Sequence, residues 1–136
     1  HEELQREVSG TPVIAWSDLD FLPIEVLQRI KPQFEVLSAA LVHLRELRER
    51  YDSADLEVER RRIQNEATSY FAEAAFHERQ IDALLPAEHR EWWDRYLERQ
   101  EAAAGLPPDP RHRARRRGGT LPLRGFQHPD DSTVTH

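Results

Sequence analysis

Histidine is the residue type in this chain best suited to hold a metal, because neutral imidazole binds zinc, nickel and copper. The sequence has seven histidines and no cysteine. The weak metal candidates are His77 and His89, which flank a predicted helix boundary, and His1, whose ring and free amine together suit copper. His77 falls among apolar helix positions, where a hydrogen-bonded core histidine is the commoner structure. We therefore predict no metal and no cofactor, and keep metal sensing as an alternative.

Carboxylates are the second group with chemical potential, since Asp and Glu number 25 against 19 Lys and Arg. Around residues 45–50 and 57–62 they alternate with arginine, which is typical of a solvated, ion-paired helix surface. The sequence has no Gly-rich phosphate loop, no Gly-x-Ser-x-Gly elbow and no His-Glu-x-x-His helix. These patterns predict that the chain is not an enzyme.

A run of arginines at residues 111–117 gives the chain an uneven charge. Residues 1–104 hold 22 acidic and 13 basic residues, a net charge of −9, whereas residues 105–136 hold six arginines and three aspartates, a net charge of +3. An acidic body repels nucleic-acid phosphate, so we predict no nucleic-acid partner. Anionic lipid headgroups or an acidic protein suit such an arm better.

The elements that position these residues follow from heptad spacing. Apolar residues recur every three or four positions from Ile30 to Tyr51 and again from Ile63 to Leu84. The sequence therefore predicts an all-α fold, with a long antiparallel helical hairpin (about residues 23–51 and 56–84) and a third, C-terminal helix at about 86–104. A turn near Ser53 places His77 opposite the region of Ile30. Pro32 is expected to kink the first helix or to start it afresh.

The flanks are predicted to be less regular than the hairpin domain of residues 21–104. Residues 1–20 form an extended N-terminal segment with one short helix, and residues 105–136 form a long irregular, Pro- and Arg-rich C-terminal arm. We predict that partner contacts come from exposed aromatic residues, from the arginines and from apolar anchors along the arm. These residues are Trp16, Trp92, Trp93, Arg113, Arg115, Arg116, Arg117, Leu121, Leu123 and Phe126.

Two short motifs open predicted helices: Leu22-Pro23-Ile24-Glu25-Val26 and Leu85-Pro86-Ala87-Glu88-His89. In position and layout they resemble the paired motifs of the periplasmic LTxxQ proteins (the Spy, CpxP, ZraP and CnrX group), over roughly residues 20–104. Proline replaces the motif threonine in both copies, Val26 and His89 replace the glutamines, and the methionines of that family are absent. The resemblance implies a bent helical hairpin, often dimeric, in the periplasm.

Together these features favour a non-catalytic protein-binding module of the cell envelope. The expected role is an extrinsic periplasmic subunit of a larger membrane (energy-converting) complex, docked on protein subunits through the C-terminal arm, with anionic lipid and a homodimer as further possible partners. The chain starts at His1 and has no apolar run of the roughly 20 residues that span a bilayer. We expect a removed signal peptide and a location peripheral to the membrane. The alternatives are a Spy- or CpxP-like stress chaperone or regulator and a CnrX-like metal sensor.

Overall fold

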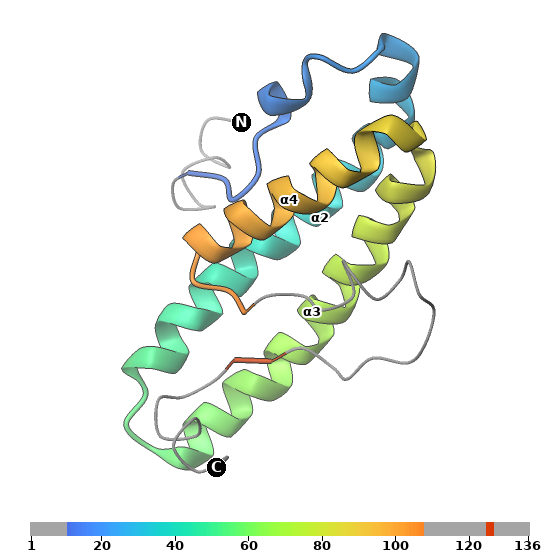
Figure 1. Ribbon diagram of the computed structural model, residues 1–136. Helices are drawn as coiled ribbons and strands as arrows, with labels where there is room; N and C mark the ends of the chain where they lie inside the picture. Colours follow the sequence, from blue (N-terminus) through green and yellow to red (C-terminus); the bar gives the residue numbers. More distant parts are fainter. Residues whose placement is uncertain (1–10, 108–124, 127–136) are drawn as a thin grey trace, which may run out of the picture.

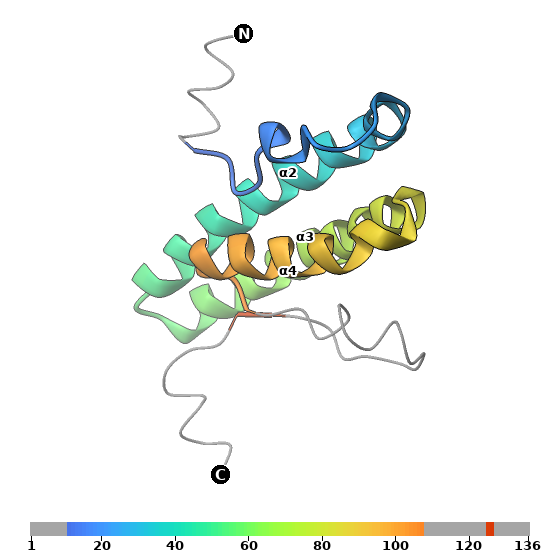
Figure 2. The same cartoon turned by 45° about the horizontal axis from the view of Figure 1, so that its top comes forward.

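The computed structural model describes residues 11–107 and 125–126, and all regular structure in this part of the chain is helical (Figure 1). A short 3-10 helix, η1 (Trp16–Leu19), precedes the three α-helices, which are α2 (Ile24–Ser53), α3 (Glu57–Leu84) and α4 (Ala87–Ala103). Helices α2 and α3 run antiparallel as a long hairpin, and α4 turns back along it (Figures 1 and 2). The predicted all-α fold, with a hairpin and a third helix, is confirmed.

The heptad positions form the core between α2 and α3. Each fully buried aliphatic side chain stabilises the fold by roughly 1.5–3 kcal/mol. Several of the heptad side chains are 0% exposed. The register agrees with the predicted turn, since the Nδ1 atom of His77 lies within hydrogen-bond distance of the Oε1 atom of Gln33, one turn from Ile30. The buried heptad residues are Ile30, Phe34, Leu37, Leu41, Leu44 and Tyr51 in α2 and Ile63, Ala67, Ala74 and Ile81 in α3.

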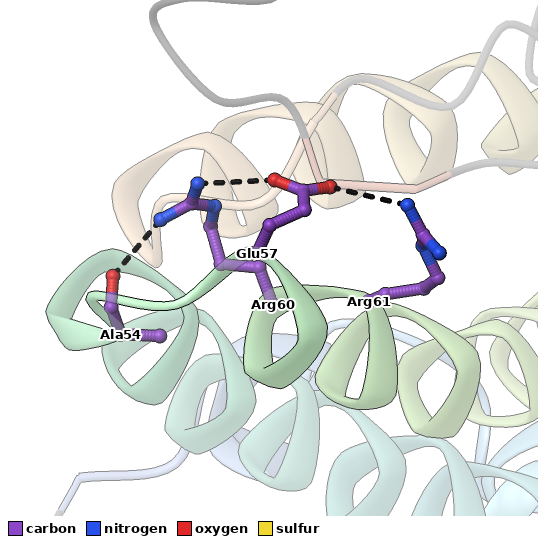
Figure 3. A network of polar contacts seen from close by, with 4 residues as sticks. All are labelled: Ala54, Glu57, Arg60 and Arg61. Carbon is purple, nitrogen blue, oxygen red and sulfur yellow. Dashed lines mark hydrogen bonds and ion pairs between the residues drawn. The ribbon is translucent and has the colours of Figure 1, made fainter.

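The turn between α2 and α3 is closed by an arginine (Figure 3). Leu56 occupies the N-cap position of α3, and no side chain caps the helix there. Instead, the guanidinium of Arg60 donates one hydrogen bond of 3.0 Å to the carbonyl of Ala54 and another of 3.0 Å to the Glu57 carboxylate. Glu57 also lies in the first helical turn, where a negative charge interacts favourably with the free backbone N–H groups.

Pro32 does not interrupt α2, which is one continuous helix from Ile24 to Ser53. The expectation that a helix starts afresh at this proline is therefore wrong. The ring of Pro32 is exposed to solvent, while Ile30 and Phe34 on either side of it are buried. Core packing on the opposite face keeps the helix intact despite the missing backbone N–H.

The segment before α2 belongs to the same core as the hairpin. The side chains of Val13, Ile14 and Leu19 are 4%, 1% and 0% exposed, and they pack in one cluster with the buried residues of the helices. Gln100 of α4 donates a hydrogen bond of 3.1 Å to the carbonyl of Val13. The segment thereby ties α4 to the rest of the molecule. The short helix predicted within residues 1–8 lies outside the described residues.

Candidate protein-binding surfaces

A group of aromatic rings lies where the chain enters α2 and α4, and we call it the aromatic surface: Phe21 is exposed, and His89 and Trp92 are half-buried. The ring of Phe21 meets that of Trp92 edge to face, with centroids 4.7 Å apart, and meets His89 in the same way at 5.3 Å. Phe21 is nevertheless 52% exposed, and Ile24, three residues later, is 64% exposed. The aromatic surface is thus ordered by ring contacts within the chain, while Phe21 and the nearby Ile24 stay exposed to solvent.

Residues beneath the aromatic surface hold it in place. Trp92 stacks on Tyr96 with centroids 5.0 Å apart, whereas its neighbour Trp93 is 0% exposed and lies in the core. Trp16, half-buried, packs edge to face on Phe34 at 5.1 Å. Of the three tryptophans predicted to contact a partner, Trp92 and Trp16 are therefore accessible in part, and Trp93 supports the fold.

Tyr96 links α4 to the segment before α2. Its hydroxyl accepts a hydrogen bond of 2.9 Å from the backbone N–H of Ala15 and donates one of 2.8 Å to the carboxylate of Asp18. Burial, and to a lesser extent the neighbouring Asp18 carboxylate, raise the pKa of Tyr96 to about 12, although the Ala15 hydrogen bond works in the opposite direction. The phenol therefore stays neutral throughout the physiological pH range and acts as a structural link under Trp92.

A second candidate site lies between α2 and α3, nearer the turn of the hairpin, and we call it the Phe126 site. The ring of Phe126 is 3% exposed and lies 5.4 Å from the ring of Tyr51 and 5.4 Å from that of Phe71. The guanidinium of Arg48 covers it at 5.7 Å from the ring centroid, within cation–π range. Figures 1 and 2 show residues 125–126 lying across the hairpin beside the end of α4.

Gln64 of α3 binds the backbone of Phe126 at both polar groups. Its amide nitrogen donates a hydrogen bond of 2.8 Å to the Phe126 carbonyl, and its amide oxygen accepts one of 2.7 Å from the Phe126 N–H. Sequence reasoning missed Gln64, because a single glutamine in a polar helix carries no signal of its own. It did select Phe126 as an anchor, but for a separate partner. In the structure, this anchor is inserted into the chain's own hairpin.

The three histidines among the described residues each have a different partner. His77 contacts Gln33, His43 stacks on Tyr70 with centroids 5.0 Å apart, and His89 belongs to the aromatic surface. Within residues 11–107 and 125–126, no three His, Asp or Glu side chains are grouped so that they could hold a metal ion. His1, the arginines at 113 and 115–117, Leu121 and Leu123 lie outside the described residues.

Comparisons with protein-family models, with curated proteins and with solved structures each found no match to this chain. Nothing in them bears on the resemblance to the LTxxQ proteins, which stays a prediction. In the part of the chain that the structure describes, no helix is long and apolar enough to cross a membrane.

Proposed function

We propose that this chain is a non-catalytic protein-binding module, an extrinsic periplasmic subunit docked on a larger, membrane-bound complex of the cell envelope. The observation that carries the proposal is the aromatic surface. Phe21 keeps 52% of its surface exposed although it has two ring partners, and Ile24, three residues later, keeps 64%. Aromatic residues grouped in this way on a rigid support are typical of the centre of a protein interface.

The position of the aromatic surface suits rigid docking. Its residues come from the chain entering α2 and from the first two turns of α4, so they lie at one end of the hairpin (Figure 1). The rings beneath them are fixed by stacking and by the Tyr96 hydrogen bonds. Little side-chain entropy is lost when such pre-ordered rings are covered, and this favours affinity.

Affinity purification from native membranes tests this proposal. The intact chain is compared with a Phe21→Ala/Ile24→Ala variant and with a matched control, Leu56→Ala/Val58→Ala, which removes two equally exposed apolar residues (60% and 59%) at the opposite end of the hairpin. We expect the intact chain and the control to capture one complex in fixed stoichiometry. The Phe21→Ala/Ile24→Ala variant should lose it, since truncated interface anchors each cost roughly 2 kcal/mol or more.

Two results would contradict the docked-subunit proposal. Equal capture by both double variants would show that the aromatic surface is not the contact. Capture of many proteins in substoichiometric amounts by all three chains would instead support the stress-chaperone alternative. That alternative predicts in addition that the intact chain suppresses aggregation of a model substrate at an equimolar ratio.

A further inference from the structure

The Phe126 site has the features of a peptide-binding site that already holds a ligand. Residues 125–126 and their main hydrogen-bond partner Gln64 are separated by more than 60 positions in the sequence, with the rest of α3 and all of α4 between them. We propose that the Phe126 site binds extended segments in which glycine precedes an aromatic residue. Gly125–Phe126 occupies it from within the chain, and an equivalent segment of a partner protein binds when the internal segment leaves.

Gln64 recognises the backbone of its ligand rather than a particular side chain. One amide group pairs with both the N–H and the C=O of Phe126, at 2.7 and 2.8 Å. This two-bond exchange is the one that paired residues make in an antiparallel sheet. Peptide-binding domains that add a strand to a sheet edge gain affinity from the same kind of contact. It requires an extended ligand but no covalent connection to the hairpin.

Two aromatic side chains and one arginine surround the ring of Phe126. Tyr51 and Phe71 contact the ring of Phe126 from α2 and α3, and Arg48 covers it, so that the ring is 97% removed from solvent. An aromatic ring buried in this way is the kind of anchor that dominates the affinity of short peptides. The second residue of the ligand is therefore aromatic: its ring packs on Tyr51 and Phe71, and its backbone binds the Gln64 amide.

The residue before the aromatic ring must be small. A Cβ atom at position 125 would lie 2.9 Å from the Oε1 atom of Gln64, closer than real Cβ contacts. The Gln64 side chain is flexible enough to move away, but Oε1 is also the atom that accepts the Phe126 N–H. A side chain at position 125 therefore weakens the backbone pairing, and this makes glycine the preferred residue at that position.

The internal segment competes with any external ligand. A ligand that belongs to the same chain competes at an effective concentration of about 1 mM. An external peptide with micromolar affinity therefore reaches the site in the unmodified chain only at about millimolar concentration. A partner that makes further contacts, or that pulls on the arm, displaces the internal segment more readily. The site is remote from Phe21 and the aromatic surface, so this inference stands independently of the proposed docking contact.

The test measures binding of a labelled peptide to the full-length chain by fluorescence anisotropy. The peptide spans residues 121–130, and the receptor is the Phe126→Ala chain, which keeps the site but lacks the internal ring. We expect micromolar binding to this receptor and roughly 1,000-fold weaker apparent binding to the unmodified chain, because the internal ligand competes at an effective concentration of about 1 mM. A peptide carrying Phe126→Ala should not bind, and one carrying Gly125→Ala should bind more weakly.

Matched variants identify the site on the receptor. Adding Gln64→Ala to the Phe126→Ala chain should weaken peptide binding by about 10-fold or more, because two hydrogen bonds are lost. Adding Asn65→Ala, which removes the exposed amide next to Gln64, should leave it unchanged. If the Phe126→Ala chain fails to fold, the Gly125→Ala chain replaces it as the receptor, since it keeps the ring but holds its own segment less tightly.

The inference is overturned if a folded Phe126→Ala chain, with the helical circular dichroism of the unmodified chain, does not bind the peptide at millimolar concentration. The same holds if the Gln64→Ala and Asn65→Ala receptors bind it equally. Dimers of the unmodified chain that form at millimolar concentration and vanish with Phe126→Ala would support the inference, because they would show the segment binding between molecules.

Discussion

At the residue scale, Tyr96 illustrates how one hydroxyl joins segments far apart in the sequence. It connects α4 to Ala15 and Asp18, which precede α2. Replacing it by phenylalanine keeps the ring on Trp92 and removes both hydrogen bonds. We expect Tyr96→Phe to lower the free energy of unfolding at pH 7 by about 1–2 kcal/mol, because the Ala15 N–H loses its partner. Tyr70→Phe is the matched control, and urea denaturation gives both values.

The raised pKa of Tyr96 determines how the free energy of unfolding changes in alkaline solution. The folded-state pKa of Tyr96 is raised to about 12 from the usual value of 10. The protonated phenol therefore contributes its full stabilisation below pH 10, and this contribution is lost as the pH rises from 10 to 12. We expect the unmodified chain to lose about 1–2 kcal/mol over this window in excess of the loss in Tyr96→Phe. If the free energies of unfolding of the two chains change equally over this pH window, the structural role assigned to the Tyr96 hydroxyl is contradicted.

Individual residues also show what the sequence could not predict. Trp92, in the apolar stripe of the last helix, and Phe126, an apolar anchor along the arm, are both predicted to contact a partner protein, and each has an aromatic neighbour in the structure. The partners are in the same chain, however. A pattern of residue types does not distinguish contacts within a chain from contacts between chains. Gln64 had no signal because its role arises only when residues 62 positions apart meet.

At the scale of the elements, Pro32 sets up a measurable conflict between local preference and packing. A proline inside a helix costs about 3 kcal/mol relative to alanine, partly offset by its smaller entropy in the unfolded chain. Because α2 is continuous and Pro32 is exposed, alanine fits without new contacts. We expect Pro32→Ala to raise the free energy of unfolding by about 1–2 kcal/mol. A loss of stability in urea denaturation would show that the proline imposes a bend on which the core depends.

The turn between α2 and α3 gives a second prediction at this scale (Figure 3). Arg60, with 18% of its side chain exposed, donates hydrogen bonds to the Ala54 carbonyl and to Glu57, whereas the guanidinium of Arg61, 71% exposed, lies 3.8 Å from the Glu57 carboxylate. We expect Arg60→Ala to destabilise the chain by about 1 kcal/mol and Arg61→Ala by at most about 0.5 kcal/mol. Thermal unfolding of the two variants compares them directly, and equal shifts would remove Arg60 as the closing residue.

The heptad pattern made α2 and α3 predictable, because their period of three and four residues has one physical meaning: a single buried stripe. The ends of α2 and α3 were harder to predict than the helices themselves. The sequence predicts a turn near Ser53, but not that Leu56 is the N-cap of α3 or that an arginine from the first turn of α3 closes the connection. Side-chain caps follow local rules, whereas a closing contact six residues along the chain depends on how the turn bends.

At the scale of the whole molecule, the hairpin presents two separate surfaces. The aromatic surface lies at the end where α2 and α4 begin, and the Phe126 site lies nearer the turn (Figure 1). The order of helices followed from the sequence, but the joining of residues 13–22 to the hairpin core did not. Val13 and Ile14 are only two apolar residues without a period, so nothing in the pattern indicated which helices they contact.

Site-specific photo-crosslinking tests whether the aromatic surface docks on one defined protein partner. The experiment is done in the cells that naturally produce this chain. The photoreactive residue p-benzoylphenylalanine is placed at position 21, and at position 58 as an equally exposed control on the opposite end of the hairpin. If the aromatic surface is the docking contact, we expect one discrete crosslinked product from position 21 and none from position 58. No product from position 21, or a smear of many products from both positions, would contradict it.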